Sequence, residues 1–373
     1  MINVLVSINK CDSGGQKSLT MAYLRNLDPK KVHFDLVVDS DSNSIPYDEV
    51  KALGGGLHVI PPYQKIFAHM KALRKLMKEN HYDVFHAMNN TMNIFPLFVA
   101  WTHGVKVRVS ESLTTASKLE KKKTMMKNVL KQFSHWFCNY YTANGIESAE
   151  YQFGKKTMAE GKVAIFLNPV DAKKNDFDPA LREECRQQMG WQGKVVYGTI
   201  ARFETQKNPL FLIDVMNAIR KKSAKAQFCI IGIGSMEEQM KAKIEEYGFG
   251  DSMRWLGRRE DIRQFYNAYD AFLLPSLYEG FPVVGVESQA AGLPVFFSDA
   301  VTREAGIEEL GHYIELSKSA EEWADIVIAE TEKLMPLRRG RQEYLKSHGF
   351  DAVTEAERLT EYWLKAIEEQ KNK

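Results

Sequence analysis

The chain has 373 residues, which is more than one ordinary hydrophobic core accommodates and suits two domains. Its composition is that of a globular protein, and a formal net charge of +2 argues against a dedicated nucleic-acid-binding protein. The four cysteines lie far apart and form no Cys-x-x-Cys pair, which suggests neither a zinc site nor a disulfide framework and fits a reducing cytoplasm.

The start of the chain predicts a buried strand at Val4–Ile8, with no basic leader and no cleavage site of a secretion signal. No apolar run approaches the roughly twenty residues that cross a bilayer. We therefore expect a cytoplasmic protein, either free or peripheral on the inner face of the plasma membrane. Gly14 and Gly15 follow the strand, where they either form a plain turn or let the backbone approach a ligand closely.

Strands and helices then alternate through the first half of the chain. This rhythm predicts parallel strands joined by crossover helices. Further strands are expected at residues 34–38, 57–60, 83–87, 105–109, 138–143 and 162–166, with helices from residue 17 and over 65–78 and 145–153.

Two polar positions in this half invite a ligand. The Asp39-Ser40-Asp41 stretch has the spacing of a metal-binding Asp-x-Asp, but it ends a strand in a loop rich in Ser, Asn and Asp, which indicates a turn. His86 is expected at the carboxyl end of a strand, where open α/β sheets place ligands, although a half-buried structural histidine fits equally well.

The stretch Lys118–Phe137 is basic and amphipathic. It is either a surface helix with a solvated lysine face or a helix that lies on an anionic membrane. A polar linker over residues 172–176 then marks the expected domain boundary.

The second half again alternates. Strands are expected at residues 194–201, 227–231, 254–258, 271–274, 294–298 and 313–315, with helices from residues 210 and 236 and over 261–269, 282–291, 320–334, 337–347 and 351–370. The predicted fold class is therefore α/β with two Rossmann-like, doubly wound domains, residues 1–170 and 171–348, followed by a helix within residues 349–373.

Arg202 and Lys207 flank a strand-to-helix turn in this half. Two cations beside a helix N-terminus suit a diphosphate, because arginine engages two oxygens and lysine acts as a point charge; two solvated surface cations are the alternative. The turn at Gly232 and Gly234 suggests a dinucleotide-binding fingerprint, but Glu237 occupies the third glycine position, which argues against a nicotinamide site.

The most informative stretch is Pro275–Glu287, which follows the apolar strand at residues 271–274. Pro282 can open a helix, and the N–H groups of Gly280, Phe281 and the next residues would then form a site for an anion such as phosphate. Glu279 and Glu287 lie eight residues apart, one in the loop and one about two turns into the helix. Because a carboxylate and a phosphate repel one another, a carboxylate beside a phosphate site is expected to accept hydrogen bonds from hydroxyl groups, as on a sugar.

This stretch, with its Glu-Gly-Phe-Pro turn and its Ala-Gly-x-Pro-Val ending at residues 291–295, resembles the glutamate-x7-glutamate signature of the family 4 retaining glycosyltransferases, also called group 1. The similarity is to enzymes of bacterial capsule and exopolysaccharide synthesis, which have the two-domain GT-B fold. The Arg202-x4-Lys207 spacing is similar to the family's Gly-Arg-x4-Lys-Gly pattern, with Ala201 and Asn208 in place of its two glycines.

The resemblance implies a role for each residue. Glu287 would hold the ribose hydroxyls of a nucleotide-sugar, and Glu279 would contact the donor sugar beside the reacting carbon. Arg202 and Lys207 would join Glu279 in catalysis by binding the diphosphate. The donor side would also include Gly15, Gly232, Arg258, Gly280, Phe281, Pro282 and Val283.

On the acceptor side the resemblance implies His86 in an Asp-Val-x-His element, and Glu111 or Ser112 in a turn where many relatives carry histidine. It also implies that the last helix crosses back to the first domain and that the donor lies in a cleft. No metal and no cofactor are expected, because cations and a helix N-terminus can stabilise the leaving diphosphate.

The predicted function is retaining transfer of a sugar from a nucleotide-sugar, with UDP as the expected nucleotide, to a saccharide or lipid-linked saccharide. Three alternatives stand beside it: a non-catalytic subunit of the same fold that binds nucleotide or a partner, a nucleotide-sugar 2-epimerase, and a phosphorylase.

Overall fold

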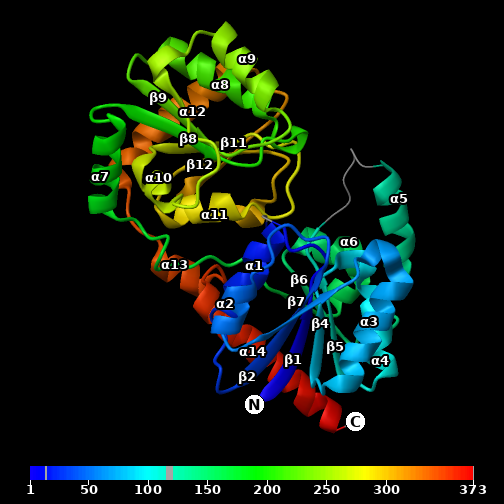
Figure 1. Ribbon diagram of the computed structural model, residues 1–373. Helices are drawn as coiled ribbons and strands as arrows, with labels where there is room; N and C mark the ends of the chain where they lie inside the picture. The colour runs from blue at the N-terminus through cyan, green and yellow to red at the C-terminus, as the bar shows by residue number, and fades with distance from the viewer. Residues whose placement is uncertain (13–14, 115–120, 373) are drawn as a thin grey trace. The chain divides into compact units, whose positions relative to one another are not determined.

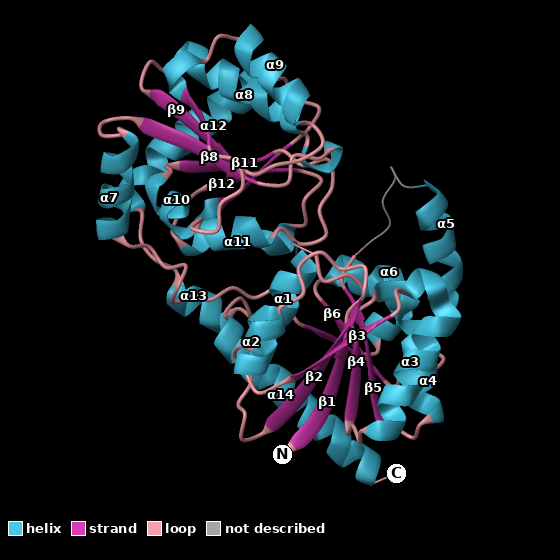
Figure 2. Ribbon diagram, viewed as in Figure 1, coloured by secondary structure: helices cyan, strands magenta, loops and turns pink. Residues whose placement is uncertain are grey.

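A computed structural model describes residues 1–12, 15–114 and 121–372, and for residues 121–124 only the backbone. The chain forms two compact units (Figures 1 and 2). Unit 1 comprises residues 1–169 and 349–373, and unit 2 comprises residues 170–348. Each unit is a parallel sheet with helices on both faces, so the α/β class predicted from the alternating pattern is confirmed.

Unit 1 contains a seven-stranded sheet in the order β3-β2-β1-β4-β5-β6-β7, with every pair parallel. Its central strands are buried on both faces, which is why they appear in the sequence as continuous apolar runs. The strands are β1 (Ile2–Ser7), β2 (Val32–Asp39), β3 (Gly56–Ile60), β4 (Val84–Ala87), β5 (Val107–Ser112), β6 (Tyr140–Ala143) and β7 (Val163–Ile165).

Helices cover both faces of this sheet. They are α1 (Gly15–Leu24), α2 (Tyr47–Ala52), α3 (Ile66–Glu79), α4 (Ile94–Thr102), α5 (Lys121–Leu130), α6 (Ile146–Ala159) and α14 (Ala352–Lys371). The long helix α14 (red in Figure 1) belongs to this unit although it ends the chain, and it buries Leu359, Trp363 and Ala366 in the same core as strands β1 and β2. Helices α3 and α4 pack on a second apolar layer around Leu5 and Phe85.

Unit 2 contains a six-stranded parallel sheet in the order β10-β9-β8-β11-β12-β13. Its strands are β8 (Val195–Ile200), β9 (Ala226–Ile231), β10 (Met253–Trp255), β11 (Ala271–Leu274), β12 (Val295–Ser298) and β13 (Gly311–Ile314). Its α-helices are α7 (Pro179–Met189), α8 (Pro209–Lys222), α9 (Glu237–Glu246), α10 (Arg263–Ala268), α11 (Val283–Ala290), α12 (Ala320–Leu334) and α13 (Gln342–Ser347).

Several expected boundaries were wrong, and three of them have a physical reason. Strand β5 runs to Ser112 and does not stop at residue 109, because its polar side chains find partners inside the unit. Pro282 precedes α11 as an extended residue and is not its first helical residue. Helix α13 begins at Gln342, because Arg338 is extended and reaches backbone carbonyls of neighbouring helices.

Within the described residues, no helix combines the length and the apolar character that a bilayer span requires.

Candidate functional site

The loop after β11, which carries Glu279, is fastened to the loop after β8, which carries Lys207. The N–H of Leu277 donates to the carbonyl of Gln206 at 2.8 Å, and the Gln206 amide donates to the carbonyl of Tyr278 at 3.0 Å. Both strands lie side by side in the sheet, so their carboxyl ends meet at one edge. The loops after β8 and β11, which carry the predicted site residues Lys207 and Glu279, are therefore joined directly by hydrogen bonds.

Lys207 and Glu279 are in direct contact. The Lys207 ammonium donates to Glu279 Oε1 at 2.5 Å, and the Ser276 hydroxyl donates to the same oxygen at 2.7 Å. The Gln206 amide lies 3.3 Å from Glu279 Oε2. The side chains of Lys207 and Glu279 are only 18% and 7% exposed, so this pair is poorly screened by water.

The sequence around Lys207 explains this placement. A short turn over Thr205–Lys207 ends at Asn208, whose φ of 52° and ψ of 48° are left-handed. Asparagine is one of the few residues besides glycine that adopts this conformation readily. Pro209 then opens α8 with a φ that suits the first helical position. Asn208 thus takes the place of the family's glycine at modest cost in backbone strain.

A third loop, after β9, packs on the first. Gly232 has a φ of +135°, and a Cβ there would lie 1.8 Å from the carbonyl oxygen of Ala201. Glu204 accepts hydrogen bonds from the Ser235 hydroxyl at 2.5 Å and its N–H at 3.2 Å, which lowers the pKa of the Glu204 carboxyl. The glycine at position 232 is required by this close approach of two backbones.

The other predicted donor residues surround these loops. Arg202 is exposed at the end of β8, and Gly280 is exposed just before α11. Helix α11 begins after Pro282 without a side-chain cap, so its first N–H groups have no acceptor within the helix. Phe281 is buried, Val283 is half-buried and Arg258 is exposed, whereas Gly15 lies exposed at the start of α1 in unit 1.

Glu287 lies two turns into α11, with its Oε2 2.8 Å from the hydroxyl of Tyr266. Burial raises the pKa of the Glu287 carboxyl, and the hydrogen bond from Tyr266 and the charge of Lys174 oppose this shift. Tyr266 itself is 1% exposed, and burial together with the nearby Glu287 raises its pKa well above 10. A partly buried carboxylate of this kind is suited to accept hydrogen bonds from hydroxyl groups.

The three residues predicted for the acceptor side do not form an open site. His86 and Glu111 are each 2% exposed and bind one another, Nε2 to Oε2, at 2.8 Å. Ser112 is fully buried and donates to the carbonyl of Ser148 at 2.8 Å. The His86 ring lies edge-on to Trp363 of α14. These side chains lie inside unit 1, which is a correction to the expected turn and accords with a structural histidine.

Asp39 and Asp41 diverge. Asp39 is buried, with Oδ1 3.4 Å from His69 Nδ1, and its Oδ2 accepts the N–H of Tyr63 at 3.2 Å. Asp41 pairs with Lys10 at 3.1 Å near the surface. The two carboxylates therefore stabilise the loop after β2 separately, as the turn interpretation expects.

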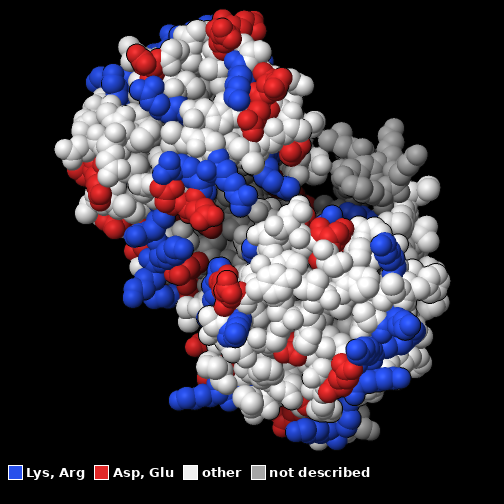
Figure 3. Space-filling model, viewed as in Figure 1, with Lys and Arg blue, Asp and Glu red and all other residues white. Residues whose placement is uncertain are grey.

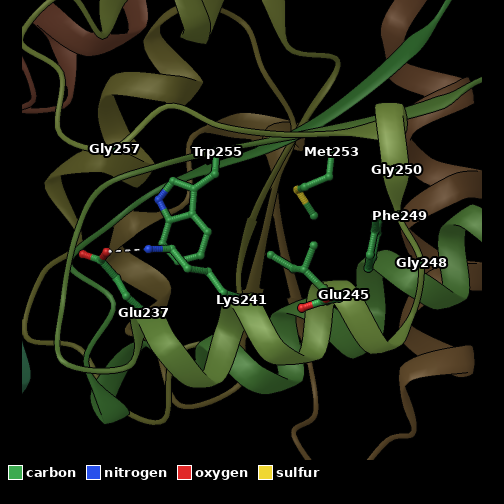
Figure 4. Close-up of a pocket in the computed structure, with 10 residues that line it drawn as sticks. Glu237, Lys241, Glu245, Gly248, Phe249, Gly250, Met253, Trp255 and Gly257 are labelled. Carbon is green, nitrogen blue, oxygen red and sulfur yellow. Dashed lines mark ion pairs between the residues drawn. The ribbon is translucent and has the colours of Figure 1, made fainter.

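A groove of about 640 Å³ lies elsewhere in unit 2, along the edge strand β10 and helix α9 (Figure 4). It is lined by Trp255, Met253 and Phe249, and by Lys241, which pairs with Glu237 at 3.6 Å. None of the predicted site residues lines it. The candidate site is therefore the set of loops after β8, β9 and β11, and not this groove.

Sequence reasoning missed Gln206, Ser276 and Tyr266, which hold the two predicted carboxylates. Gln206 stands beside Lys207, and Ser276 lies within the Pro-Ser-Leu-Tyr-Glu-Gly turn, so their neighbours offered a weak signal. Tyr266 lies 21 residues before Glu287 on another helix, and nothing local indicated their contact.

Comparisons with known proteins bear on the whole chain. The sequence model of the family described as glycosyl transferases group 1 matches residues 182–342. The chain is 27% identical over 360 residues to EpsF of Bacillus subtilis, a glycosyltransferase by its assigned name, with 94% of this chain and 93% of that protein covered.

Two further similar proteins are described with UDP or a UDP-sugar. The UDP-Gal:alpha-D-GlcNAc-diphosphoundecaprenol alpha-1,3-galactosyltransferase of Escherichia coli is 26% identical over 238 residues, covering 61% of this chain and 60% of that protein. The crystal structure of Anabaena HepE in complex with UDP superposes with a TM-score of 0.80 at 19% identity, covering 98% of this chain and 100% of that one.

Proposed function

We propose that the chain, which has the GT-B fold, is a group 1 glycosyltransferase that moves a sugar, with retention of configuration, from a UDP-sugar to a saccharide or lipid-linked saccharide. The observation that carries this proposal is the Lys207–Glu279 contact, made by the loops that precede α8 and α11. A cation and a carboxylate in contact, with Glu279 shortly before the uncapped start of a helix, suit a diphosphate attached to a sugar.

The donor would bind to unit 2. Arg202, Lys207 and the first N–H groups of α11 would hold the diphosphate, and Glu287 would accept the ribose hydroxyls. Glu279 would accept hydroxyls of the donor sugar. UDP as the nucleotide is supported by the names of the E. coli and Anabaena relatives, and polysaccharide assembly by relatives that act in bacterial polysaccharide synthesis.

In the transfer step the bond between the anomeric carbon and the diphosphate oxygen breaks, and negative charge grows on the leaving diphosphate. Lys207 and the α11 N-terminus are fixed before the reaction and stabilise that charge without reorganising. The acceptor oxygen forms the new bond on the face that the diphosphate leaves, and its proton passes to the departing phosphate oxygens. Glu279 keeps the sugar oriented throughout and forms no covalent bond.

The test is release of nucleotide without acceptor, across UDP-, GDP- and ADP-sugars. We expect slow hydrolysis of one UDP-sugar, because water replaces the acceptor once the donor is bound. The Glu279→Gln variant should lose at least about 100-fold of this rate, the range that one transition-state contact supplies, while UDP still raises the melting temperature. Near-wild-type hydrolysis by Glu279→Gln would contradict the role given to Glu279. Failure of UDP to bind would contradict the assignment of a UDP-sugar as the donor.

The same proposal extends to the membrane, because unit 1 exposes an unusual apolar area. The aromatic surface, as we call it, comprises Phe98, Trp101, Phe133, Trp136 and Phe137, whose ring centroids lie 4.6–6.3 Å from their neighbours. Its two tryptophans are 52% and 63% exposed. Exposed, clustered aromatic groups of this kind mark interaction surfaces, and tryptophan favours the membrane interface.

Helix α5 also exposes apolar side chains. Met125, Met126 and Val129 are 69%, 49% and 57% exposed, and Lys127 and Lys131 lie among them. Lys118 lies outside the described residues, and the side chains of Lys121, Lys122 and Lys123 are not described. We propose that α5 and the aromatic surface rest on an anionic membrane, where a lipid-linked acceptor would be presented.

A further inference from the structure

Tyr266 contacts the carboxylate that the proposed function assigns to the ribose. Its hydroxyl lies 2.8 Å from Glu287 Oε2, and the tyrosine is buried whereas Glu287 is half-exposed. The hydrogen bond thus comes from the interior of unit 2 and leaves the outer part of the carboxylate to meet a ligand. Tyrosine can donate only one such bond, so its direction fixes the carboxylate plane.

The ring that carries this hydroxyl is held firmly. Tyr266 packs against Phe272 of β11 with ring centroids 6.0 Å apart. Its carbonyl accepts a hydrogen bond from Arg338 Nη2 at 2.6 Å, and the same guanidinium donates to the carbonyls of Ala291 and Tyr269. Arg338 therefore ties the end of α10, which carries Tyr266, to the end of α11, which carries Glu287.

We infer that Tyr266 is the positioning residue for Glu287, holding its carboxylate in the orientation that receives the ribose hydroxyls of the donor. This inference rests on the proposed function, because it needs Glu287 to be the ribose acceptor. Tyr266 acts through Glu287 and does not touch the donor itself. Its hydrogen bond also favours the ionised carboxylate, against the burial that raises the pKa of Glu287.

The test is Tyr266→Phe, which keeps the ring and removes only the hydroxyl. A hydrogen bond to a charged group is worth about 10-fold or more in binding, so we expect the donor KM and the UDP Kd to rise by about 10-fold while kcat stays within about twofold. The charged and titratable groups that face Glu287 are Tyr266 and Lys174. Without the hydroxyl the pKa of Glu287 rises further, so the fall of kcat/KM on acidification should begin at a higher pH than in the wild type.

Tyr269→Phe is the matched control. Tyr269 is equally buried and lies three residues further along the chain, and Glu287 is not among the groups that shift its pKa, so its variant reports the loss of a buried hydroxyl alone. It should leave the donor KM and the acidic limb unchanged. If Tyr266→Phe changes only the melting temperature, as this control does, the inference is wrong and Tyr266 is merely structural.

Glu287→Gln separates this inference from the proposed function. If it weakens UDP binding and Tyr266→Phe does not, only the positioning role fails. If it leaves UDP binding unchanged, the ribose assignment fails as well. In the Tyr266→Phe/Glu287→Gln double variant, the loss of UDP binding free energy should be smaller than the sum of the losses in the two single variants, because both changes act on one contact.

Discussion

At the scale of single residues, Lys207 and Glu279 neutralise each other's charge through their ion pair. A bound diphosphate offers the ammonium a second and more highly charged partner, and the ammonium can reach both because it carries three donors. Lys207 would then contact both Glu279, which binds the donor sugar, and the leaving diphosphate.

We predict that Lys207→Met weakens UDP by about 10- to 100-fold, the range of one or two lost charge-assisted hydrogen bonds. Calorimetric titration with UDP measures this directly. The variant also leaves a nearly buried Glu279 with only Ser276 and Gln206 as partners, so its melting temperature should fall.

Lys243→Met is the comparison for this variant. Lys243 pairs with Asp214 at 2.6 Å and is similarly exposed, at 22%, but lies on α9 away from the candidate loops. It should lose some stability and keep UDP affinity. Wild-type affinity in Lys207→Met would contradict the diphosphate role of the lysine.

The motifs assigned Lys207 and Glu279 to one site, and these two side chains are in contact, but the motifs did not show what holds them. Glu287 lies in α11, as the strand–loop–helix pattern predicted, and its role stays a prediction. Contacts of Tyr266 with Glu287 and of Gln206 with Glu279 depend on how distant elements pack, so local spacing could not predict them.

His86 was expected at a strand end, either beside a ligand or as a structural histidine, and the structure shows the second. Glu111 was expected in the turn after the next strand, whereas it lies within β5. In the sheet, His86 is in register with Val109, so Glu111 lies two residues further along the neighbouring strand on the same face. The two side chains therefore satisfy one another, and the register that brings them together has no local signal in the sequence.

At the scale of elements, helix α14 carries Glu355, a buried carboxyl group that destabilises the packing of the helix on unit 1 when it is ionised. Burial raises the pKa of Glu355 to about 7, although its pairing with Arg358 at 3.0 Å lowers it. The ordinary value is 4.5, so between about pH 4.5 and 7 the folded protein holds a proton that the unfolded chain has released. This group therefore contributes nothing to stability below about pH 4.5, and the folded protein loses up to about 3 kcal/mol as the pH rises from about 4.5 to 7.

We predict that Glu355→Gln removes this dependence. Thermal melts across pH 5 to 8, the span around the cited pKa, should show the variant gaining on the wild type as the pH rises. Glu357→Gln, two residues along and exposed, should melt in parallel with the wild type. Parallel curves for Glu355→Gln would mean that this carboxyl group titrates normally in the folded protein.

Elements were predicted better than their ends. Continuous apolar runs mark strands buried on both faces, and these were found in the expected order. The ends depend on tertiary partners: β5 continues because Glu111 meets His86, and residues 338–341 are not helical because Arg338 reaches three backbone carbonyls. Such reasons become visible only when the fold is known.

At the scale of the whole molecule, charge is balanced and mixed. Acidic and basic side chains alternate over the face drawn in Figure 3, in keeping with a net charge of +2. Exposed apolar side chains are grouped on α5 and the aromatic surface. Overall charge gives little attraction to an anionic membrane, so the proposed binding relies on this region.

We predict that the protein sediments with vesicles containing phosphatidylglycerol, and that replacing Trp101 and Trp136 by serine abolishes this. Binding should weaken with salt, because the lysine contribution is screened, and vesicles of phosphatidylcholine alone should bind less. Tyr47→Ser, which removes a 56% exposed aromatic group on α2, is the control and should bind as the wild type. Undiminished sedimentation of the tryptophan variant would rule out the aromatic surface as the docking site.

The docking of α14 on unit 1 also has a consequence for biosynthesis. Four residues of α14 complete a core whose other buried residues lie within the first half of the chain: Ala356, Leu359, Trp363 and Ala366. A ribosome makes unit 2 in full before it makes this helix, so unit 2 has all of its core residues earlier although it comes second. Unit 1 must wait, with part of its apolar surface uncovered, until synthesis has passed residue 366, and that interval is when the nascent chain most needs a chaperone.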